Sequence, residues 1–202
     1  HSMRVARLVE MLSGRLELQP AETAHNVLAA LLHDLGRADE GHLTLIGIDS
    51  SATMAHRAEV HRQTPARLLA RANLPGPVCA LLHLLYETGP SSLAAPAGAR
   101  LIACADAFDD LTRNPDNPLG SRLAARKVID LMRQDHAHLF DRRVVDVLEE
   151  LVTERCDQAK TTNTRPTILV ADPDAASCSL AREHLQQAGY EVCVTHDSIE
   201  AL

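Results

Sequence analysis

Apolar residues recur every three or four positions through most of this 202-residue chain, and this spacing is typical of amphipathic helices. Aromatic residues are scarce, with two Phe, two Tyr and no Trp, so the core must be built mainly from Leu, Ala and Val. Leu and Ala favour helix. Pattern and composition together predict a mainly α protein, with an all-α helical bundle over residues 1–156.

Helix ends can be placed from capping and breaking residues. Pro20 suits the first turn of a second helix that runs to His33 and Asp34, and Gly36 supplies a stop. Residues 37–55, which contain two Gly and paired Ser, are expected to be mainly loop. The expected helices cover about residues 2–17, 20–33, 64–69, 78–85, 98–112, 120–134 and 142–156.

The pattern changes after residue 156. Residues 157–166 are polar and are expected to form a linker. Residues 167–171 then predict a short buried strand, 175–188 a helix and 191–194 a second strand, which together make a β-α-β unit. Because such a unit needs further strands to bury its faces, residues 167–202 are interpreted as the front part of a truncated α/β domain.

Charge and cysteine usage exclude several classes of protein. The formal net charge of −7 argues against binding to a nucleic-acid backbone, which needs clustered Lys and Arg. The five cysteines contain no CxxC pair, so neither a zinc ribbon nor a disulfide framework is indicated. No apolar stretch approaches the roughly 20 residues that span a bilayer. We therefore expect a cytoplasmic protein that binds neither nucleic acid nor membrane.

His33 and Asp34 form an adjacent pair of hard metal ligands at the end of an apolar helical run. Either residue could simply be a solvated helix end, but His61, His83 and Asp106 also lie in or beside apolar helical patterns. Two divalent ions bridged by a carboxylate can hold a phosphodiester and lower the pKa of a bound water. On this hypothesis His33 and Asp106 bind one ion, Asp34 bridges, and His61 and His83 serve the second. The His and Asp mix favours Fe, Mn, Co, Ni or Zn without choosing among them.

Four segments resemble the HD-GYP domain, the bacterial branch of the HD phosphohydrolases that hydrolyses cyclic di-GMP. They are LLHDLGR (31–37), HRQTPARLL (61–69), PAGARLIACADAFDDLT (96–112) and LFDRRVVDVL (139–148). Their order and approximate spacing agree with the family's LLHDIGK, HxxxGxxIL, PxxARIxxVADxFDALT and FDPxVVxxF. The resemblance implies an HD-type helical fold and a metal site. His1 with Arg4 and Val5 fits the family's opening HxxRV, whose histidine is a metal ligand, although His1 could also be the remnant of a purification tag.

The departures from the family pattern concern substrate recognition. The stretch Leu82–Pro90 stands where the family has HHExxDGxGYP, so one His and the GYP signature are missing. Arg37 replaces the family's Lys, which keeps a positive charge for phosphate but changes a point donor into a planar fork. The remaining candidates are interpreted as solvated, structural, capping or locally paired: His25, His42, His56 (a fallback ligand), His136, His138, Asp109 and Asp110.

ILVADPD (168–174) resembles the first strand of a response-regulator receiver domain, where adjacent acids help to hold Mg²⁺. Asp172 keeps one acidic position, but Pro173 replaces its usual neighbour, so Mg²⁺ binding is doubtful and depends on whether Asp174 compensates. The phosphoacceptor Asp is expected beyond Leu202.

Two functions follow from these patterns. The first is a divergent HD-GYP-type phosphodiesterase, with Asp34 and Arg37 as catalytic residues, that acts on cyclic di-GMP or a related phosphate ester. The second is a catalytically degenerate module that acts in two-component signalling by binding a protein partner. Formation of a homodimer is left open.

Overall fold

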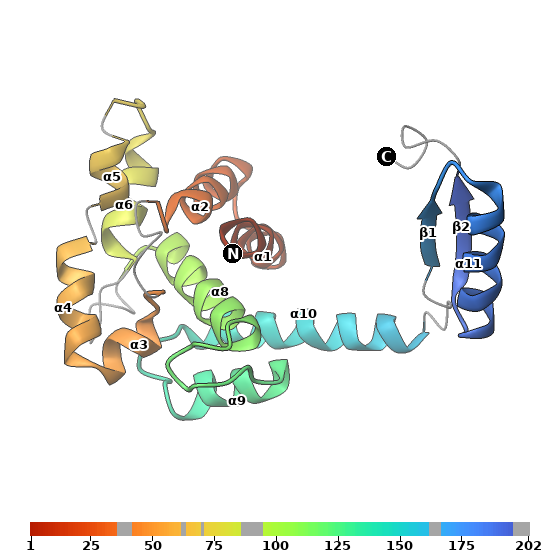
Figure 1. Cartoon of the computed structure of the whole chain (residues 1–202). Coiled ribbons are helices and arrows are strands. Elements are labelled where there is room, and N and C mark those ends of the chain that lie inside the picture. The colour runs from red at the N-terminus through yellow and green to blue at the C-terminus, as the bar shows by residue number, and fades with distance from the viewer. Residues whose placement is uncertain (36–41, 62–63, 70, 86–94, 162–166, 196–202) are drawn as a thin grey trace. The chain divides into compact units, whose positions relative to one another are not determined.

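The structure is a computed structural model that describes residues 1–35, 42–61, 64–69, 71–85, 95–161 and 167–195. The chain divides into two compact units, His1–Thr153 and Glu154–Leu202, and each is described by itself. The first unit is built from helices and the second contains a small parallel sheet (Figure 1).

The helices of the first unit follow the apolar pattern of the sequence. Within the described residues they are α1 (Ser2–Arg15), α2 (Pro20–Leu32), α3 (Leu45–Ser50), α4 (Ala52–His61), α5 (Thr64–Leu68), α6 (Gly76–Leu84), α8 (Ala97–Arg113), α9 (Ala125–Gln134) and α10 (Arg142–Thr161). The last of these crosses the boundary between the two units.

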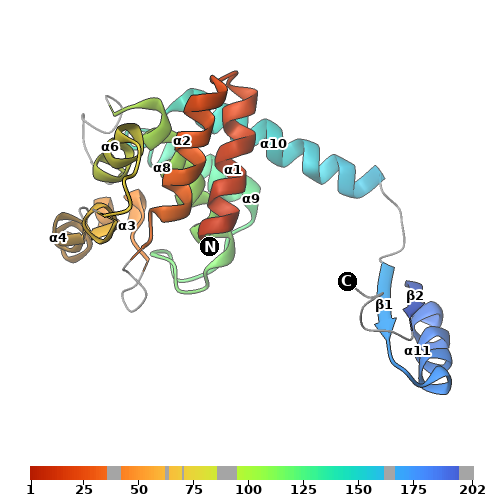
Figure 2. The same ribbon diagram turned by 90° about the horizontal axis from the view of Figure 1, so that it is seen from above.

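Helix α8 is the centre of the first unit. It packs against α1, α2, α3, α6 and α9, and α1 and α2 lie side by side (Figure 2). Most of α8 is buried, including the charged residues Asp106, Asp109 and Asp110. Three buried carboxyl groups on one helix are unusual, because burying a charge is costly unless it is paired. These carboxyl groups make α8 a candidate location for a functional site.

Small aliphatic side chains make up the core, as the composition requires. Val5, Val9 and Leu12 of α1 are fully buried, and so are Leu101 and Ile102 of α8. Burying a Leu or Val side chain contributes about 1.5–3 kcal/mol, so the stripe of α1 fixes this helix against the core. Ser2 and His1 at the start of α1 are thereby held in a defined place.

The prediction of a loop over residues 37–55 is wrong in its second half, where α3 and the start of α4 lie. The Thr44 hydroxyl caps α3 by accepting a hydrogen bond from the Gly47 amide at 3.2 Å, and Leu45, Ile46 and Ile48 are buried. Three buried apolar side chains outweigh the weak helix propensity of Gly and Ser in a helix of six residues. Residues 36–41 lie outside the described part of the chain.

The second unit has the predicted order of strand, helix and strand. Strands β1 (Thr167–Ala171) and β2 (Glu191–Thr195) pair in parallel, with Leu169 opposite Cys193, and α11 (Ala175–Gln187) connects them. Asp174 caps α11 by accepting hydrogen bonds from the amides of Ala176 and Ser177. Helix α10 runs to Thr161, into the interval expected to be linker, and residues 162–166 are outside the described part.

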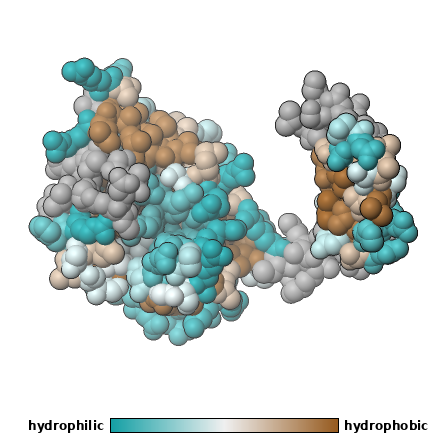
Figure 3. Space-filling view, in the orientation of Figure 1, coloured by the Kyte–Doolittle hydropathy of each residue, from teal (hydrophilic) through white to brown (hydrophobic). Residues whose placement is uncertain are grey.

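No helix among the described residues is both long enough and apolar enough to cross a membrane. Large apolar side chains on the surface of the first unit include Leu31, Leu35 and Leu68, and Figure 3 shows apolar surface in the region of α2, α5 and α6. Binding of a protein partner at this surface stays a prediction.

Gly98 allows α2, α6 and α8 to approach closely. A Cβ atom at this position would lie 2.8 Å from Asn26 Cγ of α2 and 2.9 Å from Leu81 Cδ2 of α6. We therefore expect Gly98→Ala to lower the free energy of unfolding by about 1–3 kcal/mol through overpacking, measured by urea denaturation. Gly14→Ala is the matched control, because no atom lies within 4 Å of its Cβ position; it should raise stability by about 0.5 kcal/mol. Equal effects of the two substitutions would contradict this packing account.

Candidate metal centre

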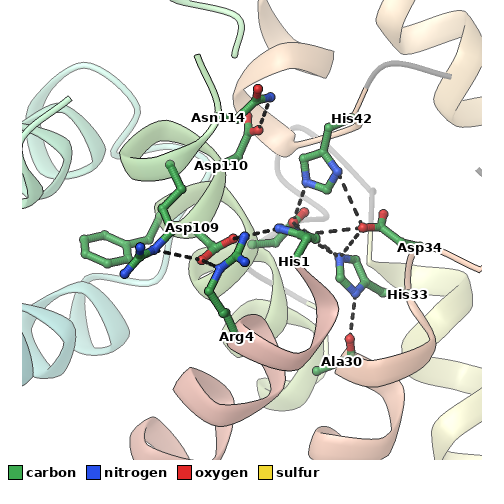
Figure 4. Close-up of polar contacts among 12 residues, drawn as sticks. His1, Arg4, Ala30, His33, Asp34, His42, Asp109, Asp110 and Asn114 are labelled. Atoms are coloured by element: carbon green, nitrogen blue, oxygen red, sulfur yellow. Dashed lines mark hydrogen bonds and ion pairs between the residues drawn. The ribbon is translucent and has the colours of Figure 1, made fainter. Parts of the chain in front are cut away.

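Five side chains from four separate segments converge beside the centre of α8. His1 is the residue immediately before α1, His33 ends α2 and is followed by Asp34, and His42 lies just before α3. Asp106 lies in the middle of α8. Figure 4 shows the rings of His1, His33 and His42 turned toward one another, with Asp34 beside them. Two helix ends and a short connecting segment therefore place ligands around one buried carboxylate.

The Asp106 carboxylate is the common contact of the three imidazoles. Its Oδ1 lies 3.0 Å from His1 Nε2, 3.3 Å from His33 Nε2 and 2.7 Å from His42 Nε2. Asp34 Oδ2 lies 3.4 Å from both His1 Nε2 and His33 Nε2, and 3.5 Å from His42 Nδ1. Four ring nitrogens, two of them from His42, thus lie close to one oxygen of Asp106 or of Asp34.

Burial differs across this cluster. His33 and Asp106 are almost completely buried, whereas the side chains of His1, His42 and Asp34 are 23%, 17% and 22% exposed. A pocket of about 320 Å³ opens beside the exposed part and is lined by residues that include His1, His42, Arg4 and Arg113. A small molecule in this pocket can therefore reach the exposed part of the cluster.

The tautomer of His33 is set by the end of α2. Its Nδ1 lies 2.7 Å from the Ala30 carbonyl oxygen, which can only accept, so Nδ1 carries the hydrogen. A neutral His33 then directs the lone pair of Nε2 toward the oxygens of Asp34 and Asp106. A lone pair facing two carboxylates is repulsive unless a cation lies between them. Metal-ligating histidines typically have this arrangement, in which the nitrogen that does not bind the metal donates a hydrogen bond to a carbonyl or carboxylate oxygen.

The distances within the cluster fit a divalent ion. Ligands about 2.1 Å from one cation lie about 3.0 Å apart in neighbouring positions of an octahedron and about 3.4 Å apart in a tetrahedron. The contacts to Asp106 and Asp34 range from 2.7 to 3.5 Å, and one ligand atom from each of His1, His33, Asp34 and His42 lies within 4.8 Å of the others. Imidazole and carboxylate donors suit borderline transition ions.

Electrostatics favour positive charge at the same point. Burial, the largest effect, would lower the pKa of His1, yet hydrogen bonds to Asp106 and Asp109 raise it to about 10. The pKa of His42 is also raised against the effect of burial, chiefly by the charge of Asp106. Burial would raise the pKa of Asp106, but His42, His33 and His1 hold it well below its usual value. Carboxylates that attract imidazolium protons this strongly also attract a metal cation.

The structure brings together four of the six predicted metal ligands: His1, His33, Asp34 and Asp106. His83 is exposed on α6 and is not part of the cluster among the described residues. His83 does not share the buried face around it, which is formed by Val78, Leu81, Leu82 and Leu85. His61 ends α4, but the direction of its side chain is not described, and Arg37 lies outside the described residues.

His42 and Asp109 make contacts that the sequence analysis did not predict. His42 was expected to be solvated or structural, but it contacts Asp106 in the cluster. Its sequence surroundings give no metal signal, because it follows Gly41 and no apolar helical pattern precedes it. Asp109 was expected to cap or pair locally; its Oδ1 does lie 3.8 Å from Nε of Arg113, one turn further along α8, but its Oδ2 also lies 2.8 Å from Nδ1 of His1, 108 residues away. Asp110 does pair locally, with Asn114, and His56 is exposed on α4.

Comparison with known proteins agrees with this geometry. Residues 1–111, more than half of the chain, match the HD domain. The chain belongs to the HD domain family. HD domains bind divalent metal ions, and the matched residues include all five members of the cluster. The HD domain of this chain therefore has a His and Asp group able to hold such an ion.

A solved structure with a similar fold is that of Bd1817, a HDG"Y"P protein from Bdellovibrio bacteriovorus. It is 21% identical to this chain with a TM-score of 0.60, and the match covers 76% of this chain and 51% of that chain. The chain thus corresponds to about half the length of Bd1817, and the likeness concerns the fold. No curated protein matches the sequence.

The cluster predicts which histidine substitutions affect metal binding. His42→Ala should weaken binding of Co²⁺ by at least about 100-fold, because it removes a ligand and not merely a neighbour of one. His83→Ala is the matched control and should change the affinity less than about twofold. Competition with a chromophoric chelator measures both. Equal losses, or a larger loss for His83→Ala, would show that the ligands are not those of this cluster.

Proposed function

We propose that the HD domain of this protein is a metal-dependent phosphodiesterase that acts on cyclic di-GMP or a related phosphate ester. The observation that carries the proposal is the convergence of three imidazoles and two carboxylates beside an open pocket. The resemblance of the first roughly 155 residues to HD-GYP domains supports the substrate class, since HD-GYP domains hydrolyse cyclic di-GMP.

The residues of the cluster would hold a cation from two sides. His33 and Asp106 form the buried side, and His1, His42 and Asp34 form the side that faces solvent. A divalent ion at this place supplies Lewis acidity toward a phosphate and lowers the pKa of water. The two aspartates balance the charge of one such ion, so the buried cluster becomes electrically neutral when it is filled.

The adjoining pocket has the charge that a phosphate ester needs. Arg4 and Arg113 line it, and their side chains are 48% and 66% exposed. Arg4 already donates two hydrogen bonds to Asp109, so Arg113 is the guanidinium group placed to form paired hydrogen bonds with phosphate oxygens. Asp109 and Asp110 also line the pocket, but Arg4 and His1 engage both oxygens of Asp109 and Asn114 donates to Asp110.

A second function is favoured by one specific observation. The described residues form one group able to hold a metal ion, and His83, expected to serve a second ion, is exposed outside it. Together with the missing GYP signature, this supports a degenerate module that signals by binding a protein partner. The β1, α11 and β2 elements resemble the start of a receiver domain, but both oxygens of Asp174 accept hydrogen bonds at the start of α11, so Asp174 is occupied in a role other than Mg²⁺ binding.

Hydrolysis of two substrates separates these functions. Metal-loaded protein should cleave both cyclic di-GMP and bis(p-nitrophenyl) phosphate, and His33→Ala or Asp106→Ala should reduce both rates to background, because each removes a buried ligand. Asp141→Asn is the control, since Asp141 pairs with Arg100 away from the cluster, and it should retain activity.

Three outcomes are informative. Cleavage of bis(p-nitrophenyl) phosphate alone would support a hydrolase for another ester. Cleavage of neither substrate, under conditions in which an active HD phosphodiesterase cleaves both, would contradict the enzyme proposal and favour the signalling module. Unchanged rates in His33→Ala and Asp106→Ala would place the activity elsewhere.

A further inference from the structure

Asp109 is a buried carboxylate whose two oxygens are both engaged. It lies on α8 three residues after Asp106, and Arg4 of α1 holds it with a two-pronged contact. Arg4 Nε donates to Oδ1 at 2.8 Å and Arg4 Nη2 donates to Oδ2 at 2.9 Å. Paired charge-assisted hydrogen bonds of this kind fix the plane of a carboxylate. Asp109 is therefore held in one orientation.

The third contact of Asp109 is the one that faces the metal centre. Its Oδ2 lies 2.8 Å from His1 Nδ1, and an ionised carboxylate can only accept, so Nδ1 carries the hydrogen. A neutral His1 then has its lone pair on Nε2. That nitrogen lies 3.0 Å from Asp106 Oδ1 and 3.3 Å from His33 Nε2, which is inside the cluster.

We propose that Asp109, held by Arg4, is a positioning residue of the metal centre that fixes His1 so that its Nε2 faces the cation. The inference rests on the proposed metal centre. Asp109 is not itself a ligand on this account, because Arg4 and His1 together engage both of its oxygens. Asp106 and Asp109, three residues apart on one helix, thus have different roles.

His1 needs such an anchor more than His33 does. The ring of His33 is enclosed and has the Ala30 carbonyl oxygen as its partner. His1 lies before the first turn of α1 and is 23% exposed, so packing restrains its ring less than that of His33. Residues three apart at the start of a helix lie on the same face, which lets one carboxylate of α8 contact both His1 and Arg4.

A charge-neutral substitution at Asp109 should weaken the centre without removing a ligand. An amide at this position gives Arg4 no charged partner and presents either an acceptor or a donor to His1, so the tautomer of the ring is no longer fixed. Loss of a hydrogen-bonding partner behind a metal ligand typically costs 10- to 100-fold in metal affinity. The expected loss for Asp109→Asn is of that order.

A double-mutant cycle on Co²⁺ affinity tests the inference without relying on hydrolysis. Asp109→Asn should lower the affinity about 10- to 100-fold when His1 is present. In the His1→Ala background the same substitution should change the affinity by less than about twofold, because Asp109 acts through His1. Arg4→Gln should give a smaller loss that likewise disappears in the His1→Ala background, and it serves as the second variant if Asp109→Asn does not fold.

The control is Asp141→Asn, which removes a carboxylate that pairs with Arg100 outside the centre; it should alter thermal stability but leave the Co²⁺ affinity unchanged. Equal losses for Asp109→Asn in both backgrounds would show a general structural role and overturn the inference, as would no loss at all. If the wild type binds no Co²⁺, the proposed metal centre and this inference both fail. If the cycle behaves as expected while no ester is cleaved, the inference stands and the hydrolase proposal fails.

Discussion

The attraction between buried carboxylates and a positive charge is the interaction on which the first unit depends. Asp106 is buried in the middle of α8, and an isolated carboxylate there would be strongly unfavourable. Three imidazoles contact it. The lone pair of a neutral His33 faces both Asp106 and Asp34, so neutral imidazoles alone leave the negative charge of the two carboxylates uncompensated. Protons or a metal cation must supply the missing charge, and the lone pair of a neutral His33 is suited to the cation.

The scaffold makes this cluster possible by bringing chain segments together at their ends. The aliphatic stripe of α1 fixes the place of His1, and the end of α2 supplies both His33 and the carbonyl oxygen that orients it. Helix α8 carries Asp106 toward the ligands and Asp109 toward Arg4. A single buried helix therefore supplies one carboxylate to the cluster and another to the residues behind it.

Sequence reasoning could place the parts of the site that lie on regular elements. The apolar run before His33 predicts a helix that ends at the pair, and the Leu and Ile pattern around Asp106 predicts a helix buried on that side. His42 could not be found in this way, because it lies outside any regular element and its contact with Asp106 joins residues 64 positions apart. His83 follows the buried Leu82 in the sequence, but neighbouring residues lie about 100° apart around a helix, so its side chain is exposed. The contact between Asp109 and His1 joins residues 108 positions apart, and no local pattern records it.

The most direct test of the central claim is the position of a metal ion in crystals of the protein grown with Mn²⁺ or Co²⁺ and measured at the absorption edge of that metal. The account predicts an anomalous peak about 2.0–2.3 Å from Nε2 of His1 and His33, with His42, Asp34 and Asp106 completing its surroundings. A peak located away from these five side chains, or none at saturating metal, would contradict the account.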